Sequence, residues 1–246
     1  MQPALELDKL TKIFTGNRGI HEVSLVVPEG QIVGFLGPNG AGKTTTMSTL
    51  IGLTKPTGGR IHMLGKDGRK QNLDIRRDIG FLASDMALDG GLTGWQQLEY
   101  FGNLRGQFDR KYVSQLAKRL NSDLHRKFRR LSRGNKQKVA LIAALMHKPK
   151  LLLLDEPTSG LDPLIQAEFN KIILEHRDAG NTAFISSHVL SEVQELCDSV
   201  IFIREGRVVA QKSIRELTEA APKQARIVSE DKTLFSQLKK LEGIAN

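Results

Sequence analysis

The sequence predicts an α/β fold whose core is a mainly parallel β-sheet. Residues 151–156 (LLLLDE) and 182–187 (TAFISS) are continuous apolar runs, the pattern of strands that are covered on both faces of a parallel sheet. The stretch between them has the apolar spacing of a helix. A glycine-rich loop at 37–45 lies between another apolar run and another helical stretch, and such alternation is typical of α/β proteins.

Size and composition fit a globular protein. The 246 residues can bury a sizeable core as one domain, or as a domain with an inserted subdomain. Hydrophobic residues make up 39% of the chain and charged residues 26%, which excludes collagen-like, low-complexity and strongly acidic classes. Cys197 is the single cysteine, so no intramolecular disulfide can form and nothing indicates secretion.

The sequence offers no targeting or spanning segment. The first residues, MQPALELDKL, lack the basic and apolar regions of a signal peptide. No uninterrupted apolar run approaches the roughly 18 residues of a spanning helix. We therefore expect a soluble chain whose membrane role would come through a partner.

The N-terminal part predicts strands at 4–14, 21–27 and 31–37, separated by turn residues at 15–17 and 28–30. A helix with Met47, Leu50 and Ile51 on one face should follow Gly42, and another strand is expected at 60–64.

Residues 85–148 predict helices, because apolar side chains recur there at helical spacing. Three stripes carry this pattern: Trp95, Leu98 and Phe101; Val113, Leu116, Ala117 and Leu120; and Val139, Ile142, Ala143 and Met146. We interpret them as core packing, so Trp95 and Tyr100 receive no cofactor role.

The C-terminal half predicts a helix with Asp162 as N-cap, Pro163 at its first position and Gly180 at its stop, with Ile165, Phe169, Ile172 and Ile173 as its buried stripe. A helix at 189–197 comes next, and Cys197 ends its stripe as a packed apolar residue rather than a nucleophile. Glu205-Gly206 between two apolar runs predicts a hairpin. Beyond about Lys212 we expect a strand at 225–229 and a helix near 234–241.

The glycine-rich loop has the pattern of a phosphate-binding loop without mismatch, in the required place between a strand and a helix. Its residues are Gly37, Pro38, Asn39, Gly40, Ala41, Gly42, Lys43, Thr44 and Thr45. Backbone N–H groups and the helix N-terminus favour phosphate oxygens, Lys43 would reach the β- and γ-phosphates, and the Thr44 hydroxyl could ligate Mg²⁺.

Two adjacent carboxylates end the apolar run at 151–154, beside the expected phosphate loop. Asp155 would hold Mg²⁺ through water. Glu156 would polarise the water that attacks the γ-phosphate, since a general base must lie near the metal without being its ligand. Helix capping is the alternative role of these acids.

The net charge of +9 favours anionic partners such as nucleotides, nucleic acid or an acidic lipid surface. Much of it lies in one basic run: Arg126, Lys127, Arg129, Arg130, Arg133, Lys136 and Lys138. Phe128 is the only aromatic residue within this run, which leaves little base-stacking surface. We interpret the run as a solvated or phosphate-facing surface, with nucleic acid binding as the alternative.

From about Leu5 to Gln211 the chain resembles the ATP-binding cassette (ABC) family. After the phosphate loop come, in the family's order and at its usual distances, LSRGNKQK (131–138), LLLLDEP (151–157), SGLD (159–162) and ISSH (185–188). The resemblance implies a phosphate-loop NTPase with a RecA-like core and parallel sheet, an antiparallel β subdomain and an inserted helical subdomain near 85–147. The cassette would span 1–215, with a short accessory tail at 216–246.

The resemblance also implies site roles. Ser132 and Gly134 would cap the γ-phosphate of an ATP held by an opposite cassette, so that two ATP molecules lie in a head-to-tail dimer. His188 would contact the γ-phosphate and orient the water, and Asp162 would be a dimer contact. Phe14 stands where the family has an aromatic residue on adenine, with a place in the core as its alternative.

The sequence departs from the family pattern in two places. Ser84, followed by Asp85, stands where a glutamine usually ligates Mg²⁺ and couples to the partner. In the family's signature segment, here LSRGNKQK (131–138), Arg133 and Asn135 replace the usual glycine and glutamine. This variation is similar to that of cassettes that serve small bacterial exporters. We expect hydrolysis to survive, because Ser132, Gly134, Glu156 and His188 remain.

The expected function is MgATP hydrolysis that powers transport, more in keeping with export than import, through a separate integral membrane permease. The cassette would pair with a second one, as homodimer or heterodimer, on the cytoplasmic face of the membrane. Two other classes are weighed. A soluble relative acting on nucleic acid or ribosomes usually has two cassettes, coiled coils or zinc cysteines, and a phosphate-loop GTPase or kinase has no use for Ser132, Gly134 and His188.

Overall fold

The computed structural model describes residues 3–68, 73–84, 88–106 and 108–220. By their backbone contacts, Met1–Ile214 form one compact unit and Arg215–Asn246 a second. Both sheets belong to the first unit, whereas the second contributes most of helix α8 (Ile214–Ala220). Asp85 and the strand and helix expected at 225–229 and 234–241 lie outside the described residues.

A six-stranded sheet in the order β10-β9-β3-β8-β7-β6 forms the centre of the first unit. Neighbours from β9 to β6 pair in parallel, and β10 pairs antiparallel with β9. β3, β7 and β8 are buried along their whole lengths, which confirms the parallel core predicted from their apolar runs. The strands are β3 Ile32–Leu36, β6 Ile79–Leu82, β7 Leu151–Asp155, β8 Thr182–Ser187, β9 Ser199–Arg204 and β10 Arg207–Ser213.

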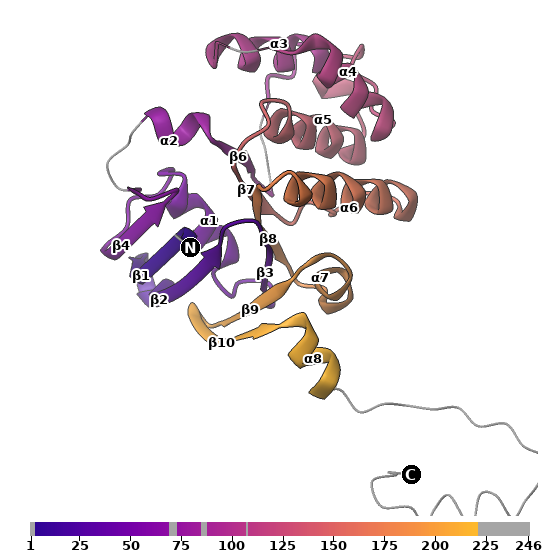
Figure 1. The fold of residues 1–246 in the computed structure, drawn as a ribbon. Helices are drawn as coiled ribbons and strands as arrows, with labels where there is room; N and C mark the ends of the chain where they lie inside the picture. Colours follow the sequence, from indigo (N-terminus) through magenta and orange to yellow (C-terminus); the bar gives the residue numbers. More distant parts are fainter. Residues whose placement is uncertain (1–2, 69–72, 85–87, 107, 221–246) are drawn as a thin grey trace, which may run out of the picture. The chain divides into compact units, whose positions relative to one another are not determined.

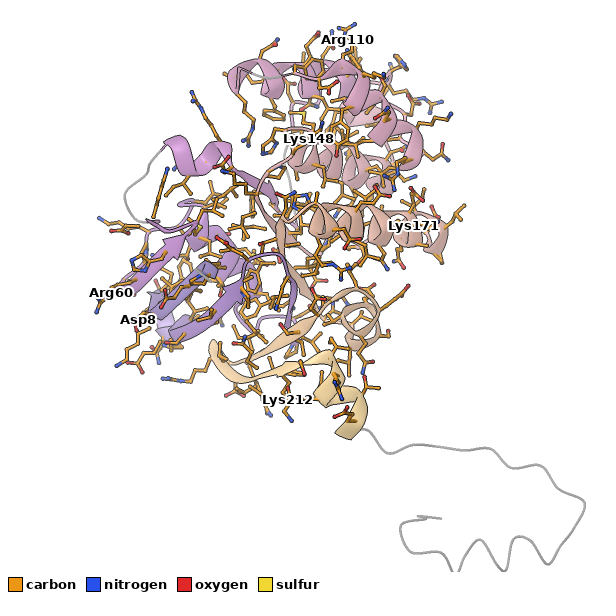
Figure 2. All side chains as sticks on the ribbon, in the orientation of Figure 1. Asp8, Arg60, Arg110, Lys148, Lys171 and Lys212 are labelled. Atoms are coloured by element: carbon orange, nitrogen blue, oxygen red, sulfur yellow. The ribbon has the colours of Figure 1, made fainter. Side chains whose placement is uncertain are left out.

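The predicted antiparallel part is a four-stranded sheet in the order β2-β1-β4-β5. Asp8 on β1 lies opposite Arg60 on β4, and their side chains form an ion pair at 3.3 Å (Figure 2). The strands are β1 Pro3–Ile13, β2 Gly19–Pro28, β4 Gly58–Met63 and β5 Lys66–Asp67, and a 3-10 turn, Thr15–Asn17, joins the first two.

Helices connect the strands of the central sheet. α1 (Lys43–Leu50) follows β3, α6 (Pro163–Asp178) links β7 to β8, and α7 (Leu190–Leu196) links β8 to β9. α6 starts and stops as predicted, because Asp162 Oδ1 accepts a hydrogen bond from the Ile165 N–H at 3.0 Å and Gly180 has a φ of +86°. Its buried residues are Ile165, Phe169, Ile172 and Ile173.

The helical subdomain lies between β6 and β7 in the sequence. Figure 1 shows α3 (Gly94–Leu104), α4 (Arg110–Arg119) and α5 (Arg133–Leu145) gathered together, and α5 also contacts β6. Thr93 and Gln96 form a reciprocal capping box at the start of α3. A short helix, α2 (Leu73–Arg77), precedes β6, and a 3-10 turn, Phe128–Arg130, precedes α5.

The hydrophobic core contains buried residues of both sheets. Phe35 on β3 and Phe184 on β8 are fully buried with ring centroids 5.2 Å apart. Cys197 is buried at the end of α7, and burial raises the pKa of its thiol to about 12. A thiol that stays protonated is a poor nucleophile, so the expected packing role fits.

Candidate nucleotide site

The site lies at the carboxyl ends of three parallel strands. The register aligns Leu36 with Ser187 and Asp155 with Ser186, so β3, β7 and β8 end at the same edge of the sheet. The segments that leave this edge are the glycine-rich loop, the pair Asp155-Glu156 and the residue His188. Such an edge is where open α/β sheets bind ligands.

The glycine-rich loop turns directly into helix α1. Gly42 has a φ of +106°, and a Cβ there would lie 2.7 Å from the Ile20 side chain, so only glycine fits. The Gly37 N–H donates to the Ser187 carbonyl at 3.2 Å, which ties the loop to the end of β8. The first N–H groups of α1 have no partner within the helix and favour an anion.

Lys43 is held at the centre of the site. Its Nζ donates to the carbonyls of Gly37 at 2.7 Å and Pro38 at 3.2 Å, and lies 3.3 Å from Glu156 Oε1. Only 6% of its side chain is exposed. These contacts position the ammonium group at the loop.

Asp155 is 1% exposed at the end of β7. One of its carboxylate oxygens accepts from the Thr44 hydroxyl at 2.7 Å, and the other accepts from the Ser186 hydroxyl. This set of oxygen donors suits Mg²⁺, which prefers oxygen ligands and keeps several from water and phosphates. Among the described residues there is no group of three or more His, Cys, Asp and Glu that could hold a metal.

Glu156 lies between two basic side chains. Its Oε2 is 2.8 Å from His188 Nδ1, its Oε1 faces Lys43, and 17% of its side chain is exposed. Its φ of +49° is left-handed, a conformation that costs a non-glycine residue roughly 1–3 kcal/mol and is concentrated at functional sites. A hydrogen bond of 3.0 Å from the Glu156 N–H to the Ser186 hydroxyl supports this turn.

Residues of the glycine-rich loop, Glu156 and His188 line a cavity of about 390 Å³, and Asp155 is not among its lining residues. It is lined by Asn39, Gly40, Gly42, Lys43, Thr44, Thr45, Ser84, Arg133, Glu156, Ser159 and His188. The structure thus brings Ser84, an exposed residue after β6, to the same cavity as the phosphate loop.

Ser132, Gly134 and Asp162 line a different cavity of about 530 Å³. Ser132 Oγ caps α5 by accepting from the Asn135 N–H at 3.3 Å. Ser132 and Gly134 therefore line a different hollow from the phosphate loop of the same chain, whereas Arg133 lines the phosphate-loop cavity.

Phe14 does not line either cavity. Its side chain is 45% exposed beside Lys12, whose ammonium lies 5.0 Å from the ring centroid. A place in the core is excluded by this exposure, while contact with adenine stays a prediction.

Three residues that support the site were not predicted from the sequence. Ser186 bonds both Asp155 and the Glu156 backbone. Glu192 Oε2 accepts from Thr158 Oγ1 at 3.0 Å and from Ser187 Oγ at 2.9 Å. Gln137 Nε2 donates to the carbonyls of Glu156 at 3.3 Å and Pro157 at 3.0 Å.

A phosphate loop that faces a buried aspartate, a glutamate and a histidine defines a phosphate-loop nucleotide hydrolase. Residues 20–159 match the family described as "ABC transporter". The chain belongs to the ABC transporter family.

Known relatives and a solved structure are consistent with membership of this family. The ABC transporter ATP-binding protein NatA of Bacillus subtilis strain 168 is 35% identical, over 93% of this chain and 93% of its own length. The bacitracin transport ATP-binding protein BcrA of Enterococcus faecalis is 35% identical, over 88% of this chain and 71% of its own. A dimeric ATP-binding cassette in a post-hydrolysis state bound to ADP and Pi is 26% identical with a TM-score of 0.75, over 86% of this chain and 99% of that one.

The chain is thus the ATP-binding subunit of an ABC transporter, an ATPase that hydrolyses ATP to drive transport. No helix in the described part of the chain combines the length and the apolar character needed to cross a membrane.

Proposed function

We propose that ATP binds in the 390 Å³ cavity and is hydrolysed there with Mg²⁺. The observation that supports this most directly is the convergence of Lys43, Thr44, Glu156 and His188 on one hollow at the strand ends. The phosphate loop would hold the phosphates through backbone N–H groups, and Lys43 would exchange its loop carbonyls for the β- and γ-phosphates.

The metal would be held by Thr44 and Asp155, whose oxygens lie 2.7 Å apart, and Ser84 lines the same cavity as Thr44. Bound there, Mg²⁺ would neutralise phosphate charge in the transition state. Glu156 would take the proton of the attacking water, and His188, bonded to Glu156, would fix the direction of that carboxylate and contact the terminal phosphate.

The second cavity supports a paired arrangement. Ser132 and Gly134 open helix α5 away from their own phosphate loop, so we propose that they contact an ATP held by another cassette. Asp162 lines the same hollow and would lie at the contact. ATP would favour the closed pair because it binds both chains.

We further propose that a membrane permease is the separate partner, that the cassette works from the cytoplasmic face, and that transport is outward. The signature variation Arg133 and Asn135, similar to cassettes that serve small bacterial exporters, supports the direction.

The test is affinity capture of the tagged chain from solubilised membranes, with ATPase activity assayed on the recovered material. Capture of a multi-spanning membrane protein, with turnover that Glu156→Gln abolishes, would support the proposal. Capture of ribosomes or nucleic acid without a membrane protein would replace it by the soluble alternative.

A further inference from the structure

Arg133 is the one residue of the signature region that lines the phosphate-loop cavity of its own chain, whereas Ser132 and Gly134 on either side of it line the other cavity. Its Nη2 donates to Ser159 Oγ at 3.4 Å, a long hydrogen bond that a ligand can replace. Ser159 lines the same cavity.

The packing of α5 explains how Arg133 reaches this cavity. The first turns of the helix lie against the segment after Glu156, since Gln137 bonds the carbonyls of Glu156 and Pro157. A Cβ on Gly134 would approach the Gly160 carbonyl to 2.8 Å, and a Cβ on Gly160 would lie 3.8 Å from Arg133 Cγ. The aliphatic part of Arg133 therefore crosses over Gly160 toward the nucleotide site.

The charge of Arg133 is available to a ligand. Within the described ranges it forms no ion pair, whereas Arg110, Arg119 and Arg126 are each paired with a carboxylate. Lys43, the other fixed cation of this cavity, faces Glu156. A guanidinium group matches phosphate oxygens with paired N–H donors.

We propose that Arg133 binds the terminal phosphate of the ATP held by the phosphate loop of the same chain, before two cassettes close. The inference rests on the proposed placement of ATP in this cavity. The terminal phosphate is chosen because Glu156 and His188, which are assigned to it, line the cavity together with Arg133. Glycine at this position, as in the usual signature, could not make the contact.

The experiment is nucleotide binding to the full-length chain in the presence of Mg²⁺, at a chain concentration where sedimentation shows monomers. The probes are a non-hydrolysable ATP analogue and ADP. Arg133→Gln should weaken binding of the ATP analogue about 5-fold, the scale of an exposed ion pair, and should leave ADP binding within error. Arg133→Lys should restore part of the difference.

The matched control is Arg130→Gln, which removes the same charge from the same basic run but lines neither cavity. Equal binding of the ATP analogue by Arg133→Gln and Arg130→Gln would overturn the inference. So would an Arg133 effect found only in paired chains, because the contact would then lie between chains. Lys43→Ala distinguishes failure of this inference from failure of the proposed ATP site. If Lys43→Ala also left binding of the ATP analogue unchanged, the placement of ATP in this cavity would be wrong.

Discussion

Glu156 Oε2 and His188 Nδ1 are 2.8 Å apart at the ends of two neighbouring parallel strands. β7 and β8 share one register, so sheet pairing fixes the separation of these two side chains. The hydrogen bond between them orients the carboxylate of the proposed base.

Replacing Glu156 by Gln should reduce ATP turnover at least 100-fold and leave ATP binding intact, because the amide keeps the shape of the side chain but cannot accept the proton. Phosphate release and equilibrium binding measure the two effects. Glu195→Gln, an exposed carboxylate on α7 outside the nucleotide cavity, is the control. Undiminished turnover would remove Glu156 from the proposed role.

Asp155→Asn should raise the Mg²⁺ concentration needed for half-maximal turnover several-fold, since an amide is a weaker ligand than a carboxylate for a hard cation. A Mg²⁺ titration of the ATPase rate checks this. Asp109→Asn keeps a good helix cap on α4 and should leave the titration unchanged. A curve unaltered by Asp155→Asn would argue against metal ligation there.

Asp162 has a structural and a proposed intermolecular role that two substitutions separate. Asp162→Ala should lower the free energy of unfolding by about 1 kcal/mol, because it removes the cap of α6. Asp162→Asn can still accept the Ile165 N–H and should be close to neutral in urea unfolding. If Asp162→Asn nonetheless weakens ATP-dependent pairing of Glu156→Gln chains in sedimentation, the contact role is supported.

Arg119 connects the helical subdomain to α6. Its guanidinium bonds Glu168 at 2.6 Å and Glu175 at 2.5 and 2.8 Å, and these hydrogen bonds hold the pKa of Glu175 below its usual range. Arg119→Ala should cost about 1 kcal/mol in unfolding experiments, because it removes ion pairs with two carboxylates on a partly solvated surface. Lys171 (Figure 2) is exposed and lies 3.7 Å from Glu168, and Lys171→Ala should cost little.

Stability should fall in mild acid because of two half-buried histidines. Burial lowers the pKa values of His147 and His176 to about 4 in the folded chain, from 6.5. Between these values the unfolded chain binds more protons, so stability is full above pH 6.5 and declines as the pH drops toward 4. Urea unfolding at pH 7.5 and 5.0 measures the decline. His147→Gln, which can still donate to the Ile79 carbonyl, should make it smaller, and an equal decline in this variant would contradict the assignment.

The features predicted best from the sequence are those determined by residues close together in the chain, such as helix ends and turns. Asp162, Pro163 and Gly180 mark both ends of α6, and Glu205-Gly206 forms the predicted hairpin turn with positive φ at both residues. The phosphate loop and the strand-end carboxylates were predictable for the same reason, because motif and context lie within a few residues.

Contacts between residues that are far apart in the sequence could not be predicted in this way. The bonds of Glu192 to Thr158 and of Gln137 to Glu156 connect separate elements, and no local pattern marks these side chains. α2 and β5 are too short to show a period. That Arg133 would lie in one cavity and its neighbours in another depends on how α5 packs, and spacing along the chain carries no such information.

Helix α5 starts beside Ser132, and a turn later its Gln137 holds the backbone of Glu156 and Pro157. One helix thus joins the surface that we propose contacts a neighbouring cassette and the chain's own proposed hydrolytic site. In the proposed pair, binding of a nucleotide by the neighbouring cassette would be transmitted directly through α5 to Glu156, the proposed base. ATP hydrolysis by the two cassettes would therefore be coupled. A pair with one inactive cassette would turn over ATP at less than half the rate of the intact pair.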